Sequence, residues 1–260
     1  MGLALVGAVV FAAAGMGEAS GKPPIPPGKP LAGPAMWVWY VPQTGKTEQM
    51  VRDLKAHGIR TVIIKSGDGI NRWKQFTPAL VDRFHQAGIH VCAWHYIYGK
   101  KPDEEARISA LAKQAGAECL IIDAEAEYNN HPRQAARYMS VLRKLVTTKY
   151  LLGLSSFPYV AYHEDFPYQE FLGGPNGAQV NLPQMYWNEI GVSPSQVVRD
   201  TYQANLRLGK PVYPVGQTWQ DPQPEQISQF TKAVKQAGAP GWSWWDWGQT
   251  SPRGWRVIKR

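Results

Sequence analysis

The chain has 260 residues, of which 44% are hydrophobic and 18% are charged. This balance excludes a disordered protein and supplies enough apolar side chains for one large domain or two small ones. The formal net charge of +8 favours anionic partners. The basic residues are scattered along the expected helices and no nucleic-acid-reading motif is present, so we expect no nucleic-acid partner.

The first 34 residues differ in composition from the rest of the chain. Residues 1–19 begin with the apolar run MGLALVGAVVFAAAGM and end in small residues, which is typical of an export signal that lacks its positive start. The run is shorter than the roughly 20 residues of a membrane span, so we expect no stable span. A truncated start or a short apolar anchor is the competing interpretation. Residues 20–34 are rich in proline and glycine, which predicts an extended linker.

From residue 35 on, strand-like and helix-like segments alternate. Apolar runs predict eight strands, at 35–41, 59–67, 89–99, 119–128, 149–158, 178–187, 210–219 and 240–248. Helical periodicity predicts helices between them, at 46–58, 77–88, 102–116, 131–148, 193–209 and 223–238. Asn130 is the expected N-cap of the helix at 131–148, with Pro132 in its first turn.

Eight strands joined by short connections through helices predict a parallel sheet closed into a (β/α)8 TIM barrel, an α/β fold, formed by a single domain at 35–260. A doubly wound sheet is the alternative. That fold usually carries a glycine-rich phosphate-binding turn, and the GDG after the second expected strand is too short to be one.

The cysteines and histidines predict no metal or cofactor site. Cys92 and Cys119 lie inside apolar runs, and we expect buried free thiols on neighbouring strands in preference to a disulfide. The six histidines form no HxxxH or HExxH pattern. A divalent cation held by clustered carboxylates is a weaker alternative.

The candidate catalytic residues lie at the end of the fourth expected strand, because sites in this barrel form at the C-terminal ends of strands. The stretch CLIIDAEAEY puts Asp123 and Glu125 on one side of the strand, and Glu127 as well if the strand persists. Crowded carboxylates raise one another's pKa, which keeps one of them protonated as a proton donor. Two carboxylates are what glycoside hydrolysis requires. The alternative is a solvated strand end with Glu127 paired to a lysine or arginine.

The other strand ends carry aromatic rings and hydrogen-bonding groups, a combination that suits sugar faces and hydroxyls. The residues expected to bind substrate are Trp37, Trp39, Lys65, Asp68, His95, Tyr96, Gln184, Tyr186, Trp187, Gln217, Trp245 and Asp246. Pairing of Lys65 with Asp68, and a core position for His95, are the structural alternatives.

The segments TVIIKSGDG, AGIHVCAWHYIYG and LIIDAEAEY, in this order and spacing, resemble the family 25 glycoside hydrolases, which are lysozyme-type N-acetylmuramidases built on a β/α barrel. The segment PQMYW is similar to that family's sixth strand, and Asp246 to an acid near its last strand. The resemblance implies cleavage of peptidoglycan or a related amino-sugar polysaccharide, with Glu125 as the general acid, Asp123 as its partner and no cofactor.

Two departures keep other functions open. The family's first strand ends in an aspartate, and MWVWYV has none. The stretch DAEAE also resembles the D-x-D-x-E strand end of chitinase-type barrels, in which Glu127 would be the acid. We therefore expect a secreted or cell-envelope glycosidase acting on an anionic or amino-sugar glycan. The alternatives are a catalytically inactive glycan-binding barrel, wall-anchored or virion-associated, and a metal-assisted hydrolase.

Overall fold

The computed structural model describes residues 29–258. The signal-like segment at 1–19 and most of the expected linker at 20–34 lie outside the described residues. Between residues 29 and 258 no helix has the length and apolar character needed to cross a bilayer.

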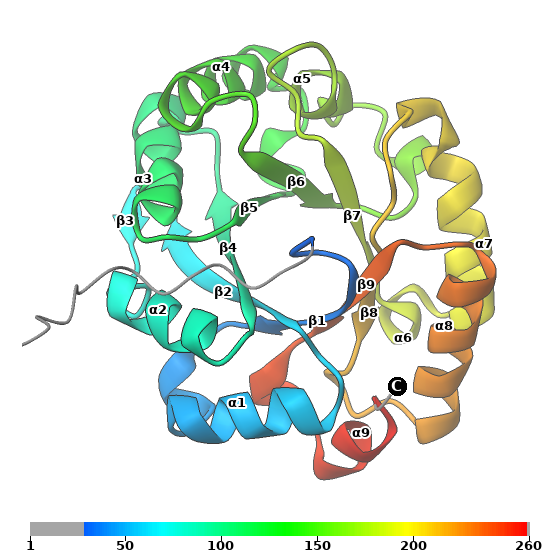
Figure 1. Ribbon diagram of the computed structural model, residues 1–260. Coiled ribbons are helices and arrows are strands. Elements are labelled where there is room, and N and C mark those ends of the chain that lie inside the picture. The colour runs from blue at the N-terminus through cyan, green and yellow to red at the C-terminus, as the bar shows by residue number, and fades with distance from the viewer. Residues whose placement is uncertain (1–28, 259–260) are drawn as a thin grey trace, which may run out of the picture.

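Eight parallel strands close into a barrel, so the predicted (β/α)8 fold is confirmed (Figure 1). Neighbouring strands pair in chain order, and the last pairs with the first. The barrel strands are β1 (Gly33–Val38), β2 (Thr61–Asp68), β4 (His90–Ile97), β5 (Cys119–Ala124), β6 (Leu151–Ser156), β7 (Val180–Met185), β8 (Val215–Gln217) and β9 (Gly241–Trp245). The two-residue strand β3 (Asn71–Arg72) pairs antiparallel with the end of β2.

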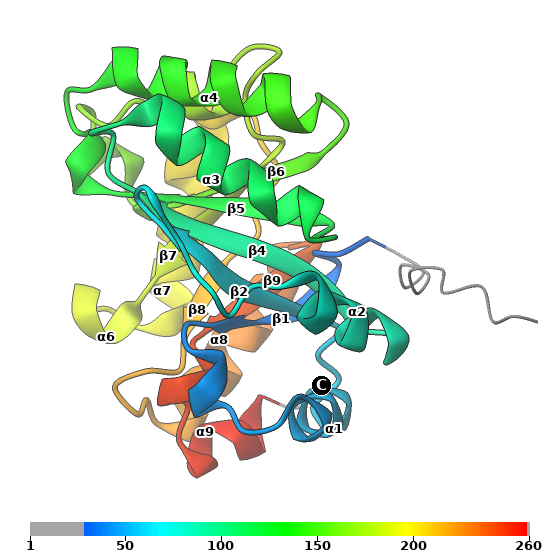
Figure 2. The ribbon, with the colours of Figure 1, turned by 90° about the vertical axis from the view of Figure 1, so that its left-hand side faces the viewer.

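The helices surround the barrel, as the two views in Figures 1 and 2 show. They are α1 (Thr47–Ala56), α2 (Pro78–Gln86), α3 (Pro102–Gln114), α4 (Pro132–Val146), α5 (Tyr168–Leu172), α6 (Trp187–Ile190), α7 (Pro194–Asn205), α8 (Pro224–Gln236) and α9 (Pro252–Val257). Six of them begin at a proline, whose fixed φ suits a first helical turn and whose missing N–H costs nothing there.

Side-chain alternation along the strands divides the apolar residues into two cores. Residues that point into the barrel, such as Trp37, Ile63 and Ile121, pack with one another along its axis. Their neighbours in sequence point outward and pack against the helices. Both faces of each parallel strand are therefore buried, which explains the nearly continuous apolar runs in the sequence.

Three local predictions were wrong. The fourth barrel strand ends at Ala124 instead of reaching residue 128, because the chain turns at Glu125 into a short 3-10 helix at Ala126–Tyr128. The N-cap of α4 is His131, while Asn130 adopts a left-handed φ of 60°. The strand expected at 210–219 keeps only Val215–Gln217, since the prolines before it cannot donate ladder hydrogen bonds.

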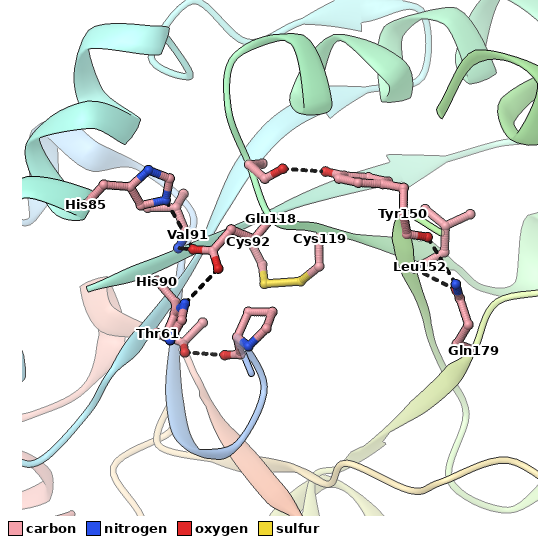
Figure 3. The surroundings of a disulfide bond; sticks show 12 residues. Thr61, His85, His90, Val91, Cys92, Glu118, Cys119, Tyr150, Leu152 and Gln179 are labelled. Carbon is pink, nitrogen blue, oxygen red and sulfur yellow. Dashed lines mark hydrogen bonds and ion pairs between the residues drawn. A yellow bond between two sulfur atoms is a disulfide. The ribbon is translucent and has the colours of Figure 1, made fainter. Parts of the chain in front are cut away.

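The two cysteines form a disulfide, which contradicts the expected free thiols (Figure 3). Cys92 on β4 and Cys119 on β5 are direct partners in the parallel register, and their Cα atoms are 4.6 Å apart. Both side chains point into the barrel. This geometry depends on the register between two strands, which the sequence of either strand alone does not reveal.

Candidate active site

Two adjoining cavities open at the C-terminal ends of the strands. The first, the Gln184 cavity, has a volume of about 220 Å³ and is lined by Trp37, Asp123, Glu125, Ser155, Gln184, Tyr186, Glu189 and Trp245. The second, the Lys65 cavity, has a volume of about 270 Å³ and is lined by Trp39, Lys65, Asp68, Trp94, Tyr96, Tyr98, Asp123, Glu125, Glu127 and Trp245. Asp123, Glu125 and Trp245 line both, so the carboxylate pair lies where the two cavities meet.

A single amide group connects the two carboxylates. The Nε2 atom of Gln184 lies 3.0 Å from Asp123 Oδ1 and 3.0 Å from Glu125 Oε1. It also lies 3.2 Å from the Oγ of Ser155. Gln184 comes from β7 and the carboxylates from β5 and the turn after it, so the barrel's strand spacing fixes this contact. The arrangement holds both acids facing the same space.

Burial raises the pKa of both acids. Asp123 is only 4% exposed, and its pKa is raised by loss of solvation first and by the nearby charge of Glu125 second. The pKa of Glu125 is raised mainly by burial, against the hydrogen bond from Gln184, which favours the charged form. Two close carboxylates in such surroundings retain a proton between them. The pair therefore combines a proton donor with a carboxylate.

Glu127 lies outside this pair. It is exposed at the rim of the Lys65 cavity, and both of its carboxylate oxygens accept from the hydroxyl of Tyr96, at 3.0 and 2.8 Å. Because the strand ends before it, the condition on which Glu127 would have joined the row of inward-facing acids is not met.

Lys65 and Asp68 both reach the Lys65 cavity although they are three positions apart, an odd spacing that would put them on opposite faces of a regular strand. A bulge between Lys65 and Gly67 shifts the register of β2 against β4, which returns the following side chains to the inner face. The Nζ atom of Lys65 lies 2.6 Å from Asp68 Oδ2. The same ammonium lies 4.5–4.9 Å from the ring centroids of Trp39, Trp73 and Trp94.

Indole rings make the walls of the site. Trp37, Trp39, Trp94 and Trp245 contact one another with centroid separations of 5.2–6.1 Å, mostly edge to face. The indole N–H of Trp37 donates to Ser243 Oγ at 2.8 Å, which fixes the deepest ring. Tyr40 stacks on Trp39 at 5.8 Å and is 43% exposed, so the aromatic surface continues to the outside. Such faces suit the C–H surfaces of sugar rings.

Four predicted substrate-binding residues lie elsewhere. His95 points outward between β4 and α3, where it contacts Ser109 Oγ at 2.6 Å and Gly69 O at 2.9 Å. Trp187 is fully buried against Phe230. Gln217 is also fully buried, and its amide binds Asn188 N and Trp219 O. These three residues are structural.

Asp246 is the fourth. It is 2% exposed and accepts a hydrogen bond from the backbone N–H of Gln249 at 3.1 Å, as the cap of a short 3-10 helix. Burial raises its pKa to about 6. Asp246 lines neither cavity.

The remaining predicted residues are brought together in the two cavities, along with Trp94 at the end of the third expected strand, and the structure adds three that the sequence reasoning missed. Ser155 is the last residue but one of β6, a strand for which no rim residue was proposed. Tyr98 follows β4 and donates to Asp68 Oδ1 at 2.8 Å. Glu189 lies on α6, after β7. Ser155 was detectable, because it is two residues beyond an inward-facing glycine, whereas the other two depend on loop conformation.

No described group of three or more histidine, cysteine or acidic side chains is arranged to hold a metal ion. The nearest set is the carboxylate pair itself, which the Gln184 amide already bridges through its nitrogen, an atom that does not coordinate metals.

Comparisons with known proteins address the fold. No family model and no curated protein matches the sequence. Among solved structures, active domain 2 of a thermostable chitinase from Pyrococcus furiosus has a TM-score of 0.65 at 11% identity, covering 91% of this chain and 94% of that one. The catalytic domain of a mannanase from Streptomyces sp. SirexAA-E has a TM-score of 0.62 at 15% identity, covering 88% and 83%.

A third structure, the spore cortex-lytic enzyme SleL of Bacillus megaterium, has a TM-score of 0.59 at 12% identity, covering 89% of this chain and 74% of that one. At these identities the similarity establishes the shared fold. The motif resemblance to family 25 gains no support from them. This chain thus has the TIM-barrel fold that these glycan-degrading proteins have.

Proposed function

We propose that this protein is a glycoside hydrolase in which Glu125 is the general acid and Asp123 is the partner with which it shares a proton. The observation that carries the proposal is the buried carboxylate pair bridged by Gln184 at the junction of two aromatic-walled cavities. A glycan chain occupying both cavities would place one glycosidic bond beside the pair. Paired carboxyl groups on either side of the scissile bond are the equipment of this reaction.

The roles follow from position. Glu125 is the more exposed of the two and ends the inward-facing row, so its proton can reach the leaving oxygen. Asp123 lies beneath it on β5, where its charge stabilises the positive charge that develops on the sugar ring or forms the glycosyl intermediate. Gln184 orients both groups, and Ser155 supports its amide.

The spacing of the pair favours retention of configuration. Since both oxygens lie 3.0 Å from the same nitrogen, they are at most about 6 Å apart. Inverting enzymes keep their carboxyl groups roughly 6.5–9.5 Å apart to admit a water molecule, and retaining enzymes about 5–5.5 Å apart. We therefore propose a retaining mechanism.

For the substrate we propose an amino-sugar polysaccharide such as peptidoglycan or chitin. The motifs similar to family 25 support this class, and the chitinase and cortex-lytic neighbours make these polymers the first to test. We also propose that the protein acts outside the cytoplasm. The buried Cys92–Cys119 disulfide and the apolar start of the sequence both support export, because structural disulfides persist mainly in oxidising compartments.

The test is release of reducing ends from peptidoglycan, chitin, galactosaminoglycan and mannan by the purified protein and by the Glu125→Gln variant. We expect release from at least one amino-sugar polymer, and a loss of at least about a hundredfold in the variant, as for removal of a general acid. Circular dichroism must show that the variant is folded. Binding of a glycan without any release by the wild-type protein would instead identify a glycan-binding barrel, and full activity of the variant would refute the assignment of Glu125.

A further inference from the structure

The Lys65 cavity is acidic in a basic protein. Its lining carries four carboxyl groups, from Asp68, Asp123, Glu125 and Glu127, and a single ammonium, from Lys65. The chain as a whole has a formal net charge of +8. A cavity with low-dielectric walls and one sign of charge concentrates ligands of the opposite sign. This lining therefore disfavours an anionic sugar and favours a cationic one.

The walls already hold one primary ammonium. Lys65 is 2% exposed, and its Nζ atom lies within 4.5–4.9 Å of three indole centroids and 2.6 Å from Asp68 Oδ2. Indole faces and a carboxylate together stabilise a desolvated ammonium. The cavity surface is thus chemically suited to this group, and the charge of Lys65 is balanced by Asp68.

Two carboxylates of the lining remain open for a ligand. Glu127 forms no ion pair with any described residue, and its only hydrogen-bond donor there is the hydroxyl of Tyr96. Asp123 is 4% exposed, lines the cavity, and accepts a hydrogen bond only from Gln184 among the described side chains. Tyr96 and Tyr98, whose rings are 5.0 Å apart, hold Glu127 and Asp68 on the same wall.

We infer that the Lys65 cavity binds a hexosamine whose amino group is free and protonated, with the ammonium on the carboxylate of Glu127. This inference deepens the proposed function and rests on it: the substrate is a glycan that is at least partly de-N-acetylated. A neutral acetamido group would leave Glu127 without a counter-charge, and an acidic sugar would be repelled by the lining. The anionic substrate expected from the net charge is therefore replaced by a cationic one.

The experiment measures binding by calorimetry to the full-length Glu125→Gln protein, so that turnover does not consume the ligand. The probes are chitotetraose with four acetyl groups and the same tetrasaccharide with four free amines, at a pH at which the amines are protonated. We expect the free-amine form to bind about tenfold more tightly, because the ion pair with Glu127 is reinforced by the acidic lining around it. Added salt reduces that difference, because the contact is ionic.

The variant that tests the contact is Glu127→Gln, made on the Glu125→Gln background. This variant should weaken binding of the free-amine tetrasaccharide, so that the affinities for the two probes differ by no more than about threefold. The matched control is Glu164→Gln, an exposed glutamate that lines a separate cavity after β6, and it should preserve the tenfold difference. Equal or tighter binding of the acetylated form, or a preference that survives Glu127→Gln, would overturn the inference while leaving the hydrolase proposal standing. Absence of binding to either probe, together with no reducing-end release from any polymer, would overturn both.

Discussion

The substitution Asp123→Asn should make the folded protein more stable at neutral pH. Burial raises the pKa of Asp123 above its ordinary value of 3.8. Below pH 3.8 the carboxyl is protonated in both the folded and the unfolded chain. As the pH rises above that value, the unfolded chain gives up its proton more readily than the folded one, so folding stability is lost progressively up to the folded-state pKa. An asparagine does not titrate and removes this loss.

The magnitude follows from the surroundings of the side chain. Asp123 is 4% exposed and receives one hydrogen bond from Gln184, which the oxygen of an asparagine would also accept. Leaving a buried polar or charged group short of partners costs about 1–3 kcal/mol. For a chain of this size each kcal/mol moves the melting temperature by about 2–4 °C. We expect Asp123→Asn to melt about 2–12 °C above the wild-type protein at pH 7.

The assay is thermal unfolding followed by circular dichroism between pH 3.5 and pH 8. The difference in melting temperature should be near zero at pH 3.5 and should grow with pH. Asp103→Asn is the control of opposite sign, because a hydrogen bond from Arg137 holds the pKa of Asp103 below its ordinary value. That variant should be less stable than the wild-type protein above about pH 4, and the difference should shrink as the pH falls below that value. An Asp123→Asn protein that melts below the wild type at pH 7 would refute the reasoning. So would a difference in melting temperature that does not change with pH.

Three further outcomes are expected. Replacing Cys92 and Cys119 together by alanine should lower the free energy of unfolding by about 2–4 kcal/mol in a denaturant titration, since the disulfide closes a loop with a sequence separation of 27; an unchanged midpoint would contradict this. Gln184→Met should reduce kcat about tenfold to a hundredfold at unchanged fold, because it releases both carboxyl groups from their shared donor, and a normal kcat would exclude that role. Gly67→Ala should cost about 1–3 kcal/mol in the same titration, because its Cβ would stand 2.8 Å from the ring of His95; wild-type stability would show that the ring moves freely.

The sequence was sufficient for the barrel and for the centre of the site. Eight apolar runs separated by helical periodicities allow few arrangements other than a closed parallel sheet. Asp123 and Glu125 then fall at a strand end on the same face, as their positions in both cavities require, whereas strand period alone left open whether Trp37 and Trp39 face into the barrel. These inferences use only the period of a strand and the direction of parallel strands.

The errors arose where side-chain direction or strand register was needed. His95 and Trp187 each adjoin an inward-facing residue, Trp94 or Tyr186, so alternation sends them toward the helices. Following the alternation of inward and outward side chains along each strand would have excluded both residues from the site. The Cys92–Cys119 bond depends instead on the register of two separate strands, and the bulge after Lys65 reverses alternation in β2. Neither feature is encoded in a local pattern of residue types.

The central claim is that the acid pair at the end of β5 acts on a glycosidic bond. The most direct measurement is the crystal structure of the Glu125→Gln protein with an oligosaccharide of a polymer that the wild-type protein cleaves. We expect a glycan chain running through both cavities, with the side chain at position 125 within hydrogen-bonding distance of a glycosidic oxygen and Asp123 beneath the adjoining sugar. A glycan bound elsewhere on the molecule, with no sugar atom in contact with either position, would contradict the account.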